Sequence, residues 1–213
     1  NTFWQINKNI IDSASSCDMM ISVDTNTSNW FQTLDYDTGR KIHYIPNYVD
    51  NREFAPREDY LSQREKVVIT YPRRLYGARG LYVVLDVIDD NLQRYDNDEF
   101  HFVGKGFNQD TKHVEKKIEK WGERVKWYSK APNEMHEVYK QSDISLIPTM
   151  YSEGTSLSCL EALSSGNVVI ATRVGGLTDL ILSDYNGKLV EPNGESIKEA
   201  LYDLLDHPEK MQM

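Results

Sequence analysis

Cysteine is scarce in this sequence, and long apolar runs and an excess of basic residues are missing from it. The two cysteines, Cys17 and Cys159, have no neighbour at metal-ligand spacing, which excludes a disulfide-rich scaffold and a cysteine-based metal site. The longest apolar runs, such as Val67–Ile69 and Val168–Ala171, are too short to span a bilayer. The net charge of −9 argues against nucleic acid as a partner, because an acidic surface repels a polyanion.

What is present is the composition of a soluble globular protein, with 39% hydrophobic and 27% charged residues. Asn1 opens a polar stretch without the basic and apolar regions of a secretory signal. We therefore expect a reduced, cytoplasmic compartment, with the full-length protein either free there or peripheral at the membrane. Because the chain starts without Met, in what reads as the middle of a helix, we expect it to be part of a longer protein.

From Lys66 onward, short apolar runs alternate with longer amphipathic stretches. Strands are predicted at Val67–Tyr71, Glu99–Val103, Arg124–Tyr128, Ile144–Pro148, Asn167–Thr172 and Lys188–Val190. Helices are predicted at Gly80–Tyr95, Thr111–Gly122, Asn133–Gln141, Ser156–Ser165, Leu177–Leu182 and Glu195–Asp206. Such alternation predicts an α/β fold, a doubly wound, Rossmann-like parallel sheet with helices on both faces. Ligands are then expected beyond the carboxyl ends of the strands.

The first fifty residues follow a different pattern. It consists of a helix from Asn1 to about Ser16, a strand at Met19–Val23, a short helix at Ser28–Leu34 and a strand at His43–Ile45. Such a βα remnant cannot bury both faces of a sheet alone. Two prolines bracket the stretch from Asn47 to Arg57, which indicates a linker. The predicted division is thus residues 1–46, a linker at 47–57 and a main domain at 58–213.

The most informative motif is Glu153-Gly-Thr-Ser-Leu-Ser-Cys-Leu-Glu161, which follows a predicted strand and leads into a helix. Small residues at a helix N-terminus predict an anion site, because free N–H groups and the helix dipole favour negative charge there. Gly154 lets the backbone approach a phosphate closely. Glu153 and Glu161 are suited to grip the two hydroxyl-bearing ends of a nucleotide-sugar. Alternatively, Ser158 and Glu161 form a capping box, in which Glu161 only satisfies the helix start.

The second motif is Arg73-Arg74-Leu-Tyr-Gly-Ala-Arg79-Gly80, directly after the first predicted strand of the main domain. Arg74 and Arg79 are predicted to face one crevice, where they can offer forked donors to phosphate oxygens. The alternative is a solvated basic loop, the usual environment of a surface arginine.

Two glycine pairs, Gly104-Lys-Gly106 and Gly175-Gly176, follow two further strands. Each is either a close loop at a ligand or an ordinary tight turn. Because all of these loops fall at one edge of the predicted sheet, a shared ligand site is favoured over four unrelated turns.

The ordered set of motifs resembles the donor-binding domain of the retaining glycosyltransferases of family four, which have the two-domain GT-B fold. The resemblance covers nearly the whole chain. Ile45-Pro-Asn-Tyr-Val-Asp50 resembles the family's Ile-Pro-Asn-Gly-Val-Asp, and Arg74 with Arg79-Gly80 resembles its Arg…Lys-Gly. Val103-Gly-Lys-Gly106 resembles the family's Val-Gly-x-Gly, and Glu153 with Glu161-Ala resembles its Glu-x7-Glu-Ala. Val174-Gly-Gly, Asn186-Gly and Pro192 continue the match in the correct order. Residues 58–213 are then the nucleotide-sugar-binding domain and residues 1–46 the end of an acceptor-binding domain.

The resemblance implies a catalytic set, in which Glu153 contacts the donor sugar while Arg74 and Arg79 neutralise the leaving diphosphate. It also implies a donor-binding set in which Glu161 holds the ribose hydroxyls. In this set the N–H groups of Gly154 to Leu157 contact the sugar and diphosphate, and backbone groups near Tyr128 to Lys130 hold the base. The members of this set are Gly104, Tyr128, Ser129, Lys130, Gly154, Thr155, Ser156, Leu157 and Glu161. Arg79 stands where lysine is usual, Tyr48 replaces the linker glycine, and Lys130 replaces a common glycine near the base.

The implied reaction passes a sugar from a nucleoside diphosphate to an acceptor hydroxyl with retention of configuration, and the acceptor attacks from the leaving-group side. Negative charge grows on the diphosphate, and donors aimed at that charge are commonly the largest catalytic contribution. No metal or other cofactor is then required. The implied partners are the nucleotide-sugar donor and an acceptor glycan, lipid or small molecule, in the synthesis of a polysaccharide, glycolipid or other glycoconjugate.

Three other functions compete with this interpretation. Asp96-Asn-Asp98 and Asp35-Tyr-Asp37 match the Asp-x-Asp pattern of metal-dependent glycosyltransferases, although the first lies at the edge opposite the predicted site. Non-hydrolysing sugar-nucleotide epimerases share the architecture. A non-catalytic nucleotide-sugar-binding module is the alternative from another class.

Apolar residues of the first segment are expected to pack against the rest of an acceptor domain: Phe3, Trp4, Ile6, Ile10, Ile11, Met19, Met20, Ile21, Trp30 and Phe31. Without that domain, the segment is expected to fold back on the main domain or to pair with a second copy of the chain. This chain alone is expected to bind the donor without transferring the sugar.

Overall fold

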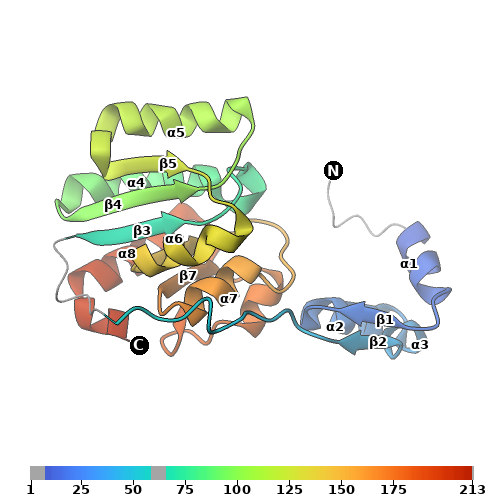
Figure 1. The fold of residues 1–213 in the computed structure, drawn as a ribbon. Coiled ribbons are helices and arrows are strands. Elements are labelled where there is room, and N and C mark those ends of the chain that lie inside the picture. Colours follow the sequence, from blue (N-terminus) through green and yellow to red (C-terminus); the bar gives the residue numbers. More distant parts are fainter. Residues whose placement is uncertain (1–7, 59–65, 213) are drawn as a thin grey trace.

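The main domain is built on a six-stranded parallel sheet (Figure 1). The computed structural model describes residues 8–58 and 66–212. Within them the strands of this sheet are β3 (Val67–Tyr71), β4 (Asp98–Val103), β5 (Val125–Tyr128), β6 (Ile144–Ile147), β7 (Val168–Thr172) and β8 (Gly187–Val190). Their order is β5-β4-β3-β6-β7-β8, so that the chain winds outward from β3 in one direction and from β6 in the other. This order confirms the predicted doubly wound fold.

Helices cover both faces of the sheet. One face carries α4 (Leu81–Arg94), α5 (Asn108–Trp121) and α8 (Gly194–Asp206), and the other carries α6 (Met135–Gln141) and α7 (Leu157–Ser164). Short 3₁₀ turns complete the domain: η2 (Gly77–Arg79), η3 (Gly122–Arg124), η4 (Pro132–Glu134), η5 (Gly175–Asp179) and η6 (Pro208–Gln212).

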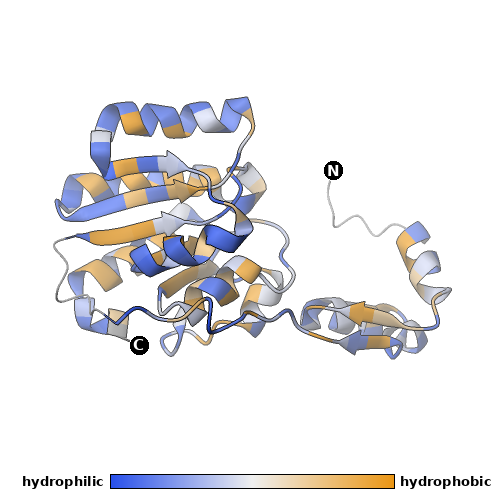
Figure 2. Cartoon of the chain, viewed as in Figure 1, coloured by the Kyte–Doolittle hydropathy of each residue, from blue (hydrophilic) through white to orange (hydrophobic). Residues whose placement is uncertain are grey.

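Alternate strand residues supply two apolar clusters, one on each face of the sheet. Ile69, Phe100 and Leu146 belong to the cluster under α4 and α8, whereas Ile147 and Val169 belong to the cluster under α6 and α7. In Figure 2, β3 and β7 are accordingly mostly hydrophobic, while α5, which covers the sheet at its β5 end, is mostly hydrophilic. Burial on both faces explains why the strands could be recognised as short apolar runs.

The prediction of a helix at Leu177–Leu182 is wrong. Its first three residues belong to the 3₁₀ turn η5 (Gly175–Asp179), in which the N–H of Leu177 donates to Val174 O, and Leu180–Leu182 are in no helix. The Asn186 side chain holds the residues after the turn, because it accepts from the N–H of Leu182 and donates to Leu180 O. The apolar residues of this segment fill the second cluster from a turn rather than from a helix face.

The first segment forms a small unit of its own, which lies to one side of the main domain in Figure 1. It contains α1 (Lys8–Ser15), β1 (Met20–Ser22), α2 (Thr25–Leu34), α3 (Tyr36–Gly39) and β2 (Ile42–Tyr44), and β1 pairs with β2 in parallel. The predicted helix from Asn1 is described from Lys8 onward, and Phe3, Trp4 and Ile6 lie outside the described residues. α3 was not predicted. It begins where the Asp35 carboxylate accepts from the N–H of Asp37 and from the Thr38 hydroxyl.

The linker at residues 47–57, all of which the structure describes, contains no helix or strand and runs along the main domain. Phe54 anchors it, since this ring is buried in the second apolar cluster beside Tyr139. Asn47 anchors its start through a hydrogen bond of 2.9 Å from Nδ2 to the carbonyl of Thr155. The linker is therefore packed against the domain that follows it.

Candidate donor-binding cleft

A cleft of about 1240 Å³ opens at the carboxyl ends of the central strands. Loops that follow β3, β4, β5 and β6 line it, together with the first turns of α4, α5 and α7. In the strand order, β3 and β6 are neighbours from which the chain winds in opposite directions, and ligands of doubly wound sheets bind at this switch point. The cleft thus lies where the sequence predicted a site.

Glu153 is at the centre of the buried polar groups in this cleft. Its Oε2 accepts three hydrogen bonds: from Arg73 Nη2 at 2.5 Å, from Arg79 Nη1 at 2.7 Å and from the Thr149 hydroxyl at 2.7 Å. The Glu153 side chain is 10% exposed. Among the described residues none donates to its other oxygen, Oε1. The carboxylate is therefore fixed by one oxygen and can accept from a ligand with the other.

The three arginines of the loop after β3 have different environments. Arg73 is buried, and its Nη1 also donates to the Thr149 hydroxyl. Arg79 is 38% exposed at its side chain and also reaches the carbonyl of Ser152 at 3.3 Å. Arg74 is exposed and lines the cleft, with no side-chain bond to any described residue. The predicted pair Arg74 and Arg79 does border one cleft, and Arg73 joins it as a third cation that the sequence analysis missed.

The sequence alone does not distinguish the role of Arg73 from that of Arg74, because the two residues are adjacent and both are arginines. What separates them is the set of long-range bonds from the Arg73 side chain to Thr149 and Glu153. In the backbone, a Cβ added at Gly104 would lie 2.2 Å from the carbonyl oxygen of Arg73. The loop after β4 therefore packs on the backbone of Arg73. The glycine at 104, predicted to belong to the donor site, lines the cleft and permits this approach.

The loop between β6 and α7 presents the backbone at the start of α7. Ser156 is the N-cap residue, and its side chain makes no capping bond. Within the described chain, the N–H groups of Gly154, Thr155, Ser156 and Leu157 have no acceptor. Of these four residues only Gly154 lines the cleft; Thr155 and Ser156 are buried, and Leu157 is half exposed. The loop can thus offer unpaired N–H donors to an anion.

Gly175-Gly176 supports this loop from behind. The N–H of Gly176 donates to Glu153 O at 2.9 Å, and Gly175 has a φ of +53°. A Cβ at Gly175 would lie 2.1 Å from Glu153 O, and one at Gly176 would lie 2.6 Å from Gly154 O. These glycines are needed for a close approach of two backbones and do not line the cleft.

Glu161 lines the cleft from α7, whereas Glu153 lies in the loop before this helix. Its Oε2 accepts from the buried hydroxyl of Tyr139 at 2.9 Å. Burial raises the pKa of Glu161, the Tyr139 hydroxyl partly offsets that shift, and the carboxylate of Glu53 adds to it. The capping-box alternative is wrong, because α7 begins at Leu157 and has no side-chain cap.

The residues predicted near the base separate into two groups. Lys130 lines the cleft beside Pro132 and Met135, and its ammonium pairs with Glu137 at 2.9 Å. Tyr128 and Ser129 are not among the lining residues. The Tyr128 hydroxyl lies 3.2 Å from His101 Nδ1 along the sheet, and burial raises its pKa. The structure therefore does not place Tyr128 and Ser129 in the lining of the candidate site.

The two Asp-x-Asp matches have structural roles. Asp98 is buried at the first residue of β4, at the edge opposite the cleft, where it pairs with Arg124 and Asn91. Asp35 caps α3. Across the described chain, no three His, Cys, Asp or Glu side chains gather in a group that could hold a metal ion.

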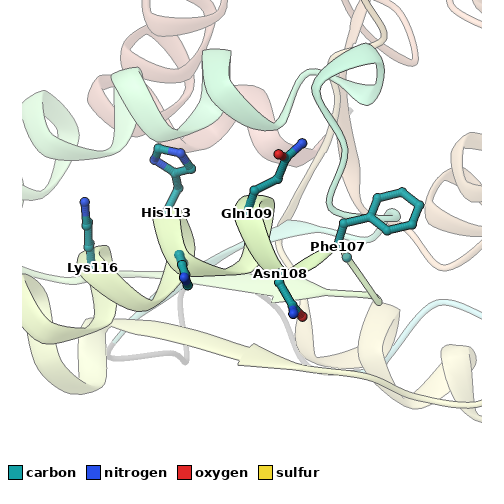
Figure 3. A pocket seen from close by; sticks show the side chains of 7 residues that line it. Phe107, Asn108, Gln109, His113 and Lys116 are labelled. Carbon is teal, nitrogen blue, oxygen red and sulfur yellow. The ribbon is translucent and has the colours of Figure 1, made fainter.

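A second hollow of about 790 Å³ lies over the start of α5 (Figure 3). Its labelled side chains diverge: Gln109, His113 and Lys116 point to one side of the helix and Asn108 to the other. Gln109 also lines the main cleft. Because polar groups do not converge on one point there, the larger cleft is the candidate site.

Comparison with known proteins agrees with this geometry. Residues 53–213, more than half of the chain, match the family described as "Glycosyl transferases group 1". The chain belongs to this family. The main domain of this group 1 glycosyl transferase therefore carries the family's sequence pattern, and the cleft lies within the matched residues. Among the described helices, none combines the length and apolarity needed to cross a bilayer.

The chain is 28% identical over 183 residues to UDP-Gal:alpha-D-GlcNAc-diphosphoundecaprenol alpha-1,3-galactosyltransferase of Escherichia coli, covering 78% of the chain and 46% of that protein. It is similar to the C-terminal domain of LpcC, a group 1 glycosyl transferase of Francisella tularensis, with 25% identity and a TM-score of 0.69, covering 77% of this chain and 91% of that one. HepE of Anabaena, solved in complex with UDP-glucose, shares the fold at a TM-score of 0.80 and 17% identity, covering 96% of this chain and 59% of HepE. The chain spans about half the length of the curated relatives it matches.

Proposed function

We propose that this chain is the nucleotide-sugar-binding part of a retaining glycosyltransferase of family four. The observation that carries the proposal is the arrangement of one cleft, in which Glu153 and Glu161 flank unpaired N–H groups at the start of α7 while Arg74 and Arg79 border the same space. Carboxylates accept hydrogen bonds from sugar and ribose hydroxyls, and arginines with helix N–H groups bind phosphate. This is the set of groups that a sugar linked to a nucleoside diphosphate needs.

In the proposed reaction the bond between the anomeric carbon and the diphosphate breaks, and the acceptor hydroxyl forms the new bond on the same face of the sugar. The electron pair of the broken bond leaves with the diphosphate. Arg74 is exposed and Arg79 partly exposed, so that both can approach the diphosphate oxygens as charge grows there. The diphosphate takes up the proton of the acceptor hydroxyl. We assign no protein nucleophile, and we propose that no metal is required.

For the donor we propose a UDP-sugar, since the relative from Escherichia coli is named for UDP-Gal and HepE was solved with UDP-glucose. The base would lie beside Lys130, Pro132 and Met135, which line the cleft after β5. The acceptor would be a glycan, a lipid-linked sugar or a small molecule. The cytoplasmic location, free or at the membrane surface, stays a prediction.

Calorimetry with UDP-, GDP- and ADP-sugars tests the donor site on this chain directly. We expect saturable binding of one nucleotide class, with UDP-glucose the strongest of the three glucose donors. Sugar transfer is expected only from a longer form of the protein. Absence of binding by every nucleotide-sugar would refute the donor site. Binding without transfer by the longer form would instead favour the non-catalytic module.

A further inference from the structure

Glu153 is held by a buried cluster of hydrogen-bond donors, and Arg73 is the more deeply buried of the two arginines in that cluster. The Arg73 side chain is 6% exposed, whereas that of Arg79 is 38% exposed. Arg73 spans two partners, with Nη1 on the Thr149 hydroxyl and Nη2 on Glu153 Oε2. An arginine held in this way cannot follow a ligand, because a bound ligand would have to displace both partners.

The supports of Arg73 are themselves fixed. Thr149 is fully buried, its hydroxyl donates to Glu153 Oε2 at 2.7 Å, and its carbonyl accepts from the hydroxyl of Thr172 at 2.5 Å. Gly104 packs on the backbone of Arg73 from the other side. The cluster therefore connects the ends of β3, β6 and β7 and the turn after β4 to one another around Glu153.

We propose that Arg73 is a positioning residue for the donor sugar: together with Thr149 it orients Glu153 so that Oε1 is left to accept the sugar's hydroxyl hydrogens. The inference rests on the proposed function and assigns to Arg73 a task distinct from that of Arg74 and Arg79. Arg74 and Arg79 act on the diphosphate, and Arg79 also donates to Glu153 Oε2, whereas the buried Arg73 acts on the sugar only through Glu153. Removing Arg73 should therefore weaken recognition of the sugar and leave recognition of the nucleoside diphosphate largely intact.

The test compares the dissociation constants of UDP-glucose and UDP by calorimetry in four proteins: the wild-type chain, Arg73→Met, Glu153→Gln and the double variant. In Arg73→Met the ratio of the UDP-glucose constant to the UDP constant should rise by about tenfold, the effect of losing a hydrogen bond to a charged group. Glu153→Gln should raise the ratio similarly. The double variant should raise it no further, because Arg73 acts through Glu153.

A second variant keeps the test valid where Arg73→Met folds poorly. Thr149→Val has nearly the same shape and leaves Arg73 in place, but it removes the hydroxyl that holds both Arg73 and Glu153. It should raise the same ratio by about threefold or more. Arg124→Met is the matched control, since Arg124 also pairs with a buried carboxylate, Asp98, at the opposite edge of the sheet. It should lower the melting temperature without changing the ratio.

Equal weakening of UDP-glucose and UDP in Arg73→Met and Thr149→Val, or additive effects of Arg73→Met and Glu153→Gln, would overturn the inference and make Arg73 a residue that only supports the loop. Binding of UDP and UDP-glucose by the wild-type chain would in that case still support the proposed function. A wild-type chain that binds neither, nor their GDP and ADP counterparts, would overturn both.

Discussion

Glu161 is the residue that we propose to hold the ribose of the donor. It is partly buried, its pKa is raised by that burial, and its one described partner is the Tyr139 hydroxyl. A glutamine at this position can still accept from Tyr139 but carries no charge. Glu161→Gln should therefore weaken UDP binding by about 1–3 kcal/mol and leave the free energy of unfolding unchanged or slightly raised. Calorimetry and thermal unfolding of the same samples measure the two effects, and normal binding with lost stability would contradict the ribose role.

The same residue predicts a pH dependence of binding. An acid whose pKa is raised in the folded protein is destabilised in its charged form, and protonation removes that cost as the pH falls through the raised pKa. In the proposed ribose contact, however, the charged form is the one that can accept from both ribose hydroxyls. The UDP affinity of the wild-type chain should fall more steeply than that of Glu161→Gln as the pH is lowered through the raised pKa of Glu161. The variant corrects for protonation of the phosphate itself, so parallel curves would remove Glu161 from the site.

Arg74 and Arg79 differ in the side-chain contacts that an alanine substitution would remove. Arg74 has no side-chain partner among the described residues, whereas Arg79 shares Glu153 Oε2 with Arg73. Arg74→Ala should weaken UDP binding by about 1.5–3 kcal/mol at unchanged stability, with little loss for uridine. Arg79→Ala should show the same preference for the diphosphate. Calorimetry with UDP and uridine decides, and equal losses for both ligands would mean that these side chains hold the loop.

Gly80 connects η2 to α4 and shows how closely two elements must approach to form the cleft. Its φ is +83°, and a Cβ there would lie 1.9 Å from the carbonyl oxygen of Pro148, just after β6. Gly80→Ala should lower the free energy of unfolding by about 2–4 kcal/mol, through backbone strain and this clash. Gly194→Ala at the start of α8 is the control, because its Cβ would meet only Val83 and Val87 at 3.8 Å. Urea unfolding compares the two, and equal stabilities would contradict the close approach.

Helices and strands could be predicted from the sequence better than contacts between residues far apart in the chain. β3 was predicted at its observed bounds because an apolar run between two polar segments is enough to define a buried strand. A helix was predicted at Leu177–Leu182 because apolar spacing alone does not show that the 3₁₀ turn η5 ends at Asp179 and that Asn186 binds the backbone beyond it. The motifs located the loops of the cleft, but the pairing of Arg73 with Glu153 joins residues 80 positions apart and has no local signal. Roles of individual site residues therefore remain proposals that the variants above test.

The small unit at residues 8–44 is joined to the main domain by few polar contacts. The N–H and hydroxyl of Thr25 donate to the Asp179 carboxylate at 2.8 and 2.6 Å, and the Thr155 hydroxyl donates to Val23 O. Asp179→Ala should therefore speed amide hydrogen exchange in β1 and β2 without changing that of the main sheet. Glu191→Ala, which removes an exposed pair with Arg173, is the control. Unchanged exchange in Asp179→Ala would show that these bonds do not hold the unit in place.

The same unit leaves apolar side chains uncovered. Ile10, Met19 and Ile21 are each more than half exposed, whereas Phe31 is buried. Exposed apolar surface costs roughly 25 cal/mol per Å², so a covering partner would stabilise this unit. Pairing with a second copy of the chain stays a prediction, and light scattering at increasing protein concentration measures it.

The saturation of Glu153 Oε2 has a consequence for inhibitor design. A compound that carries an ammonium group to neutralise this carboxylate would compete with Arg73, Arg79 and Thr149, which already supply three donors. Its gain at Oε2 would be small, because every new bond to that oxygen would replace an existing one. Arg74 is the better target, since its guanidinium is exposed at the cleft and unpaired within the described chain. A scaffold that reaches Arg74 with a flat carboxylate, and meets Glu153 Oε1 with a neutral hydroxyl, would use the protein's charges without displacing any of them.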